Sequence, residues 1–203
     1  MAERAIEQSR GVGEATSRRL GPWLAWVVCA LSLTLTALDF LLIAKNVSLN
    51  TPAYVFWPEL TSLAVGYSVI GAIIASRLPK HPIGWLCCAI GLIAAVDHFA
   101  GEYSLYALVA QPHPLMGGRT MLWLQGWFWM LFIGLIVFLL LLFPTGRLPG
   151  SRWRPFAWVS VVMISGGVIW SSAISPDVGF NAPPSSVQLS ILLLGESRQA
   201  PWL

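Results

Sequence analysis

Hydrophobic residues occur in long, nearly uninterrupted runs that polar and proline-rich segments separate. A helix rises 1.5 Å per residue, so about 20 apolar residues cross a hydrocarbon core of ~30 Å. Runs of this length predict transmembrane helices over 22–44, 57–76, 83–103, 121–143 and 156–174. A further run, Val187–Gly195, is too short to cross and ends at Glu196, so we expect it at the membrane surface or packed under a loop.

This pattern predicts an all-α integral membrane protein, a bundle of about five helices. Residues 1–21 and 175–203 are predicted as tails outside the bilayer, the first of them partly helical at best. Short loops retain Lys and Arg on the cytoplasmic side, so these residues indicate the orientation. A cytoplasmic amino terminus places Arg4, Arg10, Arg18, Arg19, Arg77, Lys80, Arg147, Arg152 and Arg154 inside, and Lys45, Arg119 and Arg198 outside. The carboxyl-terminal tail is therefore predicted outside the cell.

The composition supports lipid as the outer solvent. Hydrophobic residues make up 56% of the 203 residues and charged residues 10%, against roughly 25% charged in a soluble domain. The net charge of +3 does not indicate a nucleic-acid partner, because the basic residues lie at the ends of apolar runs. Cys29, Cys87 and Cys88 lie within such runs, which predicts small buried side chains rather than disulfides or metal ligands. We expect a multi-pass protein of a bacterial plasma membrane, with lipid as a partner.

Two predicted cytoplasmic turns are short, basic and rich in proline. The first, SRLPKHPIGW at 76–85, contains two prolines that prevent a continuous helix. The second, LFPTGRLPGSRWRP at 142–155, ends one span and begins the next. We expect their arginines to face lipid phosphates and cytoplasmic water. The residues that define these turns are Arg77, Pro79, Pro82, Pro144, Gly146, Arg147, Pro149, Arg152 and Arg154.

The segments ASRLPKHPIGWLCCAIGL and LFPTGRLPGSRWRP resemble the amino-terminal multi-span membrane region of bacterial sensor histidine kinases, especially the actinobacterial type. The resemblance covers 63–158, about half of the chain. It implies a sensory membrane module, a dimer and a cytoplasmic signalling partner. A kinase also needs a phosphoacceptor histidine on a dimerisation helix and a glycine-rich ATP lid, and neither pattern occurs around His81, His98 or His113. We therefore expect no enzyme activity, and either a truncated sensor or a free-standing relative.

Ionisable residues inside spans are costly and indicate candidate sites. In the predicted topology five of them fall toward the outer leaflet: Asp39, Glu59, Asp97, His98 and Glu102. His98 and Glu102 are four residues apart and share a helix face, whereas Asp97 points about 100° away from His98. One hypothesis is a polar cavity that binds a proton, a cation or a small polar ligand. The alternative is that these groups are hydrated at the interface or cap neighbouring helices.

Small residues four apart, as in Gly71 with Ala75, Gly91 with Ala95 and Gly167 with Ser171, allow close helix contacts, although such pairs are common in any span. No metal-ligand spacing, catalytic motif or cofactor motif is present in the sequence. The leading interpretation is a non-catalytic sensory or regulatory module. A small transporter or channel component is the main alternative, and an integral membrane enzyme is a third.

Overall fold

The computed structural model describes residues 2–46, 57–111, 113–148 and 150–176, with side chains from Gly21 in the first helix and from Thr61 in the second. This part of the chain is helical and contains no strand. Helix α1 spans Ala2–Asn46, α2 Trp57–Arg77, α3 Pro82–Leu105, α4 Gly118–Leu142 and α5 Arg154–Pro176. A π-helical turn, η2 (Tyr106–Ala110), extends α3, and a short 3-10 helix, η3 (Ser151–Trp153), precedes α5. The short predicted run at 187–195 lies outside the described residues.

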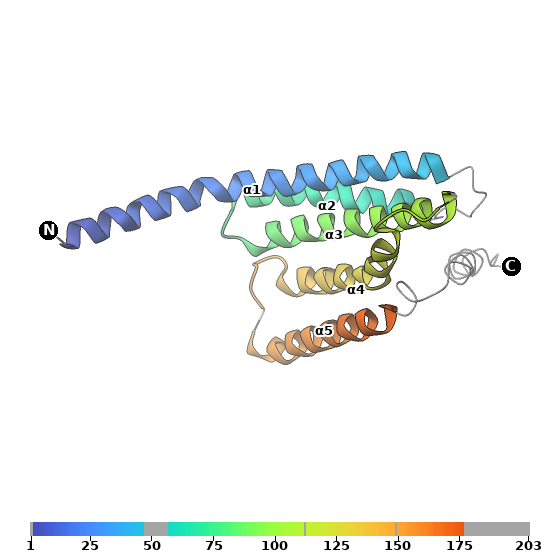
Figure 1. Ribbon diagram of the computed structural model, residues 1–203. Coiled ribbons are helices and arrows are strands. Elements are labelled where there is room, and N and C mark those ends of the chain that lie inside the picture. Colours follow the sequence, from blue (N-terminus) through green and yellow to red (C-terminus); the bar gives the residue numbers. More distant parts are fainter. Residues whose placement is uncertain (1, 47–56, 112, 149, 177–203) are drawn as a thin grey trace.

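Helices α1, α2 and α3 lie side by side, and α4 and α5 follow on the far side of α3 (Figure 1). Three apolar helical segments are long enough to cross a membrane: Gly21–Asn46, Pro82–Ala110 and Gly118–Leu142. The apolar part of α2, Thr61–Arg77, is shorter. The described helices begin and end within a few residues of the predicted spans, except that α1 begins already at Ala2 and η2 lengthens the third.

The expectation that residues 1–21 are at best partly helical is wrong. Helix α1 is continuous from Ala2 and projects beyond the bundle (Figure 1). The apolar part of α1 already forms a helix, so the polar residues before it only need to extend it, one hydrogen bond at a time. Many of them, such as Ala, Glu, Gln and Arg, are strong helix formers. Pro22 lies within α1 without ending it.

From Gly21 onward, helix α1 buries small and polar side chains and exposes large apolar ones. The buried positions lie three, four or seven residues apart and are Ala25, Cys29, Ser32, Thr36, Asp39 and Asn46. Large apolar side chains, including Trp23, Trp26, Leu31 and Leu41, cover the exposed face. A helix at the surface of a soluble protein would expose its polar side chains and bury its large apolar ones. The pattern of α1 therefore fits a helix that faces lipid on one side and makes polar contacts inside the bundle.

Small residues allow α2 and α3 to pack backbone against backbone. A Cβ atom added at Gly71 would collide with the backbone nitrogen of Cys88, and one at Gly84 would lie 2.6 Å from the backbone nitrogen of Ala75. Gly91 faces Ser68 in the same way. The contacts expected at Gly71 with Ala75 and at Gly91 with Ala95 are therefore confirmed. Gly167 of α5 contacts Met130 of α4, whereas the side chain of its predicted partner, Ser171, is not described.

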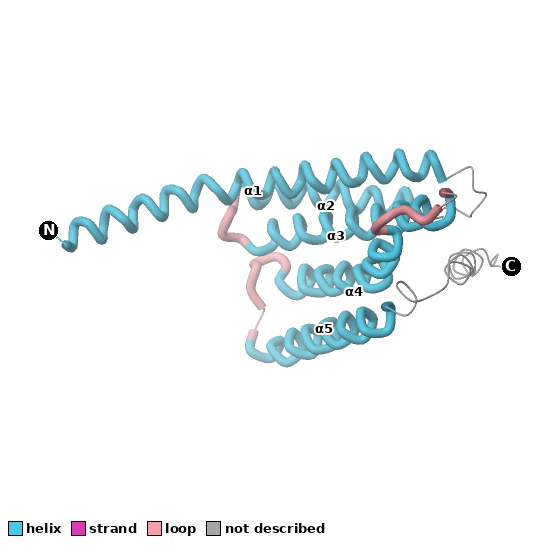
Figure 2. Tube along the Cα trace, in the orientation of Figure 1, coloured by secondary structure: helices cyan, strands magenta, loops and turns pink. Residues whose placement is uncertain are grey.

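The loops gather at the two ends of the bundle (Figure 2). We call the end with residues 78–81 and 143–150 the basic end, and the end with Asn46 and η2 the opposite end. At the basic end, Pro82 is the first residue of α3, and the Trp85 indole donates a hydrogen bond to the carbonyl of Pro79. Gly146 has φ +71°, a left-handed conformation that suits glycine. The three cysteines are buried free thiols, as expected.

Candidate functional site

The structure places three of the five predicted site residues together inside the bundle. Asp39 of α1 and Glu102 of α3 are each 1% exposed, and His98 of α3 is 5% exposed. Asp97 is half-buried and lies on another face of α3, as the helical spacing predicts. Glu59 belongs to α2, but its side chain lies outside the described residues.

Two polar contacts join α1 to α3. Asp39 Oδ2 lies 3.4 Å from His98 Nδ1, the distance of an ion pair when the imidazole is protonated. One helical turn further along α3, the Asn46 amide donates to Glu102 Oε2 at 2.6 Å and to the Glu102 carbonyl at 3.1 Å. We call these four residues, Asp39, Asn46, His98 and Glu102, the α1–α3 polar cluster.

Asn46 is the cluster member that sequence reasoning missed. The first span was predicted to end at residue 44, and only ionisable residues were considered as site candidates. The available signal was the spacing, because Asn46 follows Asp39 by seven residues, or two helical turns, and therefore shares its face. Asn46 is fully buried, and its amide donates a hydrogen bond to the Glu102 carboxyl.

The geometry follows from two helices that run in the same direction (Figure 1). Asp39 and Asn46 are seven residues apart, or about 10 Å along α1, whereas His98 and Glu102 are four apart, or about 6 Å along α3. Each residue of α1 therefore meets a different residue of α3. The cluster forms two separate contacts at different depths and is not a single centre.

Three oxygen atoms of the cluster have no hydrogen-bond donor within the described part of the chain. They are Asp39 Oδ1, Asn46 Oδ1 and Glu102 Oε1, and all three are buried. Most buried polar atoms in folded proteins have a partner, so unsatisfied ones require an explanation. All three can accept a hydrogen bond. The cluster is therefore suited to receive protons, water or another donor that reaches it.

The other buried hydroxyls of α1 do not extend the cluster. Ser32 and Thr36 donate to carbonyls of their own helix, at Val28 and Ser32, over distances of 3.0 and 2.9 Å. Such bonds satisfy a hydroxyl locally and leave it little capacity to bind a ligand. The long-range polar contacts of α1 therefore lie at the opposite end.

The His98 imidazole lies against one carboxyl of the cluster, that of Asp39. The Glu102 carboxyl instead accepts the Asn46 amide. Lys45 is exposed next to Asn46 in sequence, with its ammonium 5.3 Å from the centre of the Tyr106 ring. In the described residues, no group of three or more His, Cys, Asp or Glu side chains is placed to hold a metal ion.

The predicted turns meet each other at the basic end. A Cβ atom added at Gly146 would lie 2.9 Å from the Pro82 ring and 3.2 Å from the His81 ring. One added at Gly21 of α1 would lie 3.2 Å from Pro79. We call these five residues, Gly21, Pro79, His81, Pro82 and Gly146, the basic-end contact. It joins α1, the start of α3 and the turn after α4.

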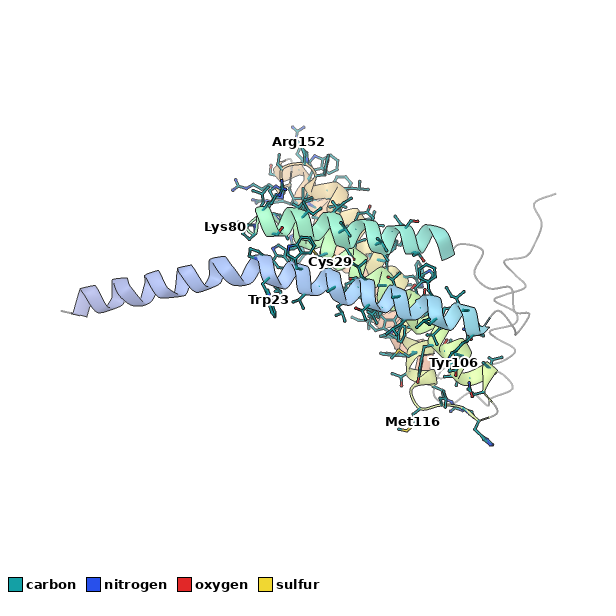
Figure 3. All side chains as sticks on the ribbon, turned by 90° about the horizontal axis from the view of Figure 1, so that it is seen from above. Trp23, Cys29, Lys80, Tyr106, Met116 and Arg152 are labelled. Atoms are coloured by element: carbon teal, nitrogen blue, oxygen red, sulfur yellow. The ribbon has the colours of Figure 1, made fainter. Side chains whose placement is uncertain are left out.

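The basic side chains of these turns are exposed around this contact. Lys80 and Arg152 lie at one end of the bundle, and Tyr106 and Met116 lie at the other (Figure 3). Arg77, Arg147 and Arg154 are exposed as well, while Pro149 lies outside the described residues. A nearby groove is lined by the apolar side chains Val137, Leu140, Leu141 and Trp153. The groove lining offers few polar groups to orient a substrate, so the polar cluster is the stronger candidate site.

No protein-family profile, curated protein or solved structure matches this chain.

Proposed function

We propose that this chain is a non-catalytic sensory or regulatory membrane module. It crosses the bilayer five times, with the basic end in the cytoplasm. The α1–α3 polar cluster is its input site and the basic-end contact is its output. The observation that carries the proposal is the cluster itself, because its buried polar contacts tie α1 to α3, which also pack against each other through Ala25 and Cys88.

The five-span arrangement is supported by helix length and by charge. Helices α2 and α5 contain 21 and 23 residues, or about 31 and 35 Å, which is enough to cross a hydrocarbon core of ~30 Å. The exposed side chains of α5 include Phe156, Trp158, Met163 and Trp170, which suit lipid. Nine basic residues in the cytoplasm against three outside favour this orientation over its reverse.

Input and output lie on the same helices at opposite ends. Helix α1 carries Asp39 and Asn46 near its carboxyl end, at the opposite end of the bundle, and Gly21 midway along, at the basic end. Helix α3 carries His98 and Glu102 at one end and begins at Pro82 in the basic-end contact. Closely packed helices move as rigid bodies between discrete arrangements. A change in the cluster that shifts α1 against α3 therefore also changes the contact of Gly21 with Pro79.

The ligand we propose is a proton, a small cation or a small polar molecule that reaches the cluster from outside the cell. The output partner is a cytoplasmic signalling protein or domain that binds near the exposed arginines. The resemblance to the membrane regions of sensor histidine kinases supports both assignments and implies a dimer. Acidic patches on such a partner would complement the basic turns.

A distance measurement tests the proposal in the full chain, with Cys29, Cys87 and Cys88 replaced by alanine. Spin labels at Lys80→Cys and Ser151→Cys, both exposed positions, report on the basic end by pulsed electron paramagnetic resonance in lipid nanodiscs. We expect Asp39→Asn combined with Glu102→Gln to shift the distance distribution. The matched control, Asp97→Asn, changes a carboxylate of α3 outside the cluster and leaves the distribution unchanged. Equal distributions in folded wild type and double variant would refute the coupling.

Transport is the second candidate function, because ionisable side chains in contact inside a span are also a feature of proton and ion pathways. Proteoliposomes that enclose a pH-sensitive dye distinguish the two functions. A sensory module conducts no net protons when a potential is applied. Steady proton flux that Asp39→Asn abolishes would identify a transporter and overturn the sensory proposal.

A further inference from the structure

We infer that the ligand of the α1–α3 polar cluster is a proton, and that it binds to Oε1 of Glu102. This inference rests on the proposed function and names the ligand of its input site. It follows from the number of charges in the cluster, from the position of its open oxygen atoms and from the groups that surround it.

The cluster holds more potential negative charge than positive charge. It contains two carboxyls, on Asp39 and Glu102, and one imidazole, on His98. The imidazole lies 3.4 Å from Asp39, so a protonated His98 neutralises that carboxylate first. Glu102 retains a neutral amide donor, Asn46, on one of its two oxygens. An ionised Glu102 therefore leaves one excess negative charge in a buried site, which is unfavourable in low dielectric.

The open oxygen atoms fit a proton better than a metal ion. A calcium-like cation needs several oxygen ligands, each about 2.3 to 2.6 Å from it. Asp39 Oδ1 and Asn46 Oδ1 belong to residues about 10 Å apart along α1, so they cannot surround one ion with Glu102. A proton requires only one acceptor. Glu102 Oε1 is buried, carries lone pairs and has no donor among the described residues.

The groups around Glu102 come from several elements. Helix α1 contributes Asp39, Asn46 and the exposed Lys45. Helix α3 contributes His98 and, on another face, Asp97. Tyr106 of η2 lies under Lys45, and the Tyr103 hydroxyl of α3 donates to the Met116 carbonyl. Helices α2 and α4, which also pack against α3, carry Tyr67 midway along α2 and Arg119 as the second residue of α4. The Glu59 side chain lies outside the described residues. Asp39 and His98 are the titratable groups of this set that belong to the α1–α3 polar cluster with Glu102.

Proton binding changes the cluster without breaking its existing contacts. Hydronium outside the cell transfers a proton to Glu102, an O–H bond forms at Oε1, and water is released. Glu102 Oε2 still accepts the Asn46 amide, while Oε1 becomes a donor. Loss of the proton to water restores a carboxylate that repels Asp39. The protonated state therefore holds α1 and α3 together, and the deprotonated state favours their separation and hydration.

Infrared difference spectroscopy of the full chain in nanodiscs tests the inference directly. The pH is changed between about 5 and 8, the physiological range for a protonation switch. The C=O stretch of protonated carboxylic acids is recorded before and after the change. We expect a band that shifts in D₂O, disappears in Glu102→Gln and persists in the control Asp97→Asn. If Glu102→Gln fails to fold, Glu102→Asp replaces it in the test. This variant keeps a carboxyl, and we expect its band at a shifted frequency.

The number of protons that each chain takes up, measured in weakly buffered solution, tests the assignment independently. Glu102→Gln is expected to take up about one proton per chain less than Asp97→Asn over the same pH change. A band and an uptake that survive unchanged in folded Glu102→Gln would overturn the assignment to Glu102. A response to Na⁺ or Ca²⁺ at constant pH, without a carboxyl band, would overturn the proton as ligand and leave the sensory proposal standing. Conversely, proton binding without any change in the distances at the basic end would support this inference and contradict the sensory proposal.

Discussion

The neutral side chain of Asn46 supplies a hydrogen-bond donor to the buried carboxyl of Glu102. Its amide reaches both the side chain and the carbonyl of Glu102, so it joins the end of α1 to α3 at two points. Asp39, His98 and Glu102 were predictable from sequence, because ionisable residues within apolar runs are conspicuous and helical spacing separates them from Asp97. Asn46 was not predicted, because a neutral residue at a span boundary has no such cost.

We predict that Asn46→Leu destabilises the bundle by about 1–3 kcal/mol, because it leaves the buried Glu102 carboxyl without its amide donor. Unfolding by detergent titration, followed by circular dichroism, measures the change. Leu41→Ala is the control, since Leu41 is 62% exposed and its truncation should cost less than about 0.5 kcal/mol. Equal stabilities of Asn46→Leu and Leu41→Ala would contradict the structural role of Asn46.

At the scale of elements, glycine positions determine how closely α2 and α3 approach. Gly71 and Gly66 lie in the same helix, but a Cβ atom at Gly71 would meet the backbone of Cys88, whereas one at Gly66 would meet nothing within 4 Å. The sequence indicated Gly71 through its spacing to Ala75. Spacing alone does not say which face of a helix meets which neighbour. The π-helical turn η2 was not predicted either, because its residues continue the apolar pattern of α3.

Gly71→Ala and Gly66→Ala form a matched pair. Gly71→Ala should destabilise the bundle by about 1–3 kcal/mol, because backbone atoms cannot move aside as easily as a side chain. Gly66→Ala should be neutral or stabilising by up to about 1 kcal/mol, since alanine is the better helix former. The same detergent titration compares the two variants. A larger loss for Gly66→Ala than for Gly71→Ala would mean that the α2–α3 contact is wrong.

At the scale of the whole molecule, the charge distribution predicts which end faces the cytoplasm, and the structure provides the positions that test it. Lys80 and Arg152 lie at one end and Met116 at the other (Figure 3). The order of the helices, and the approximate bounds of all but α1, followed from the runs of apolar residues. The packing of α4 on α3 and of α5 on α4 did not, because apolar faces in lipid carry no signal of which helix covers them.

We predict that Met116→Cys, at a position 94% exposed, reacts with a membrane-impermeant maleimide added to intact cells. Lys80→Cys should react only after the membrane is opened. Both variants carry alanine in place of the native cysteines, and a cysteine-free chain provides the background. Labelling of Lys80→Cys in intact cells, or equal labelling of both positions, would contradict the proposed orientation.

The close contact between α2 and α3 also bears on how the chain enters the bilayer during synthesis. Only four residues separate the two helices, so they form a tight hairpin. Its buried Ser68 faces Gly91 of α3 rather than lipid. Helix α2 makes its close backbone contacts only when α3 lies beside it. We therefore expect the insertion machinery to hold α2 until α3 has emerged from the ribosome, and to release the two into lipid as one hairpin.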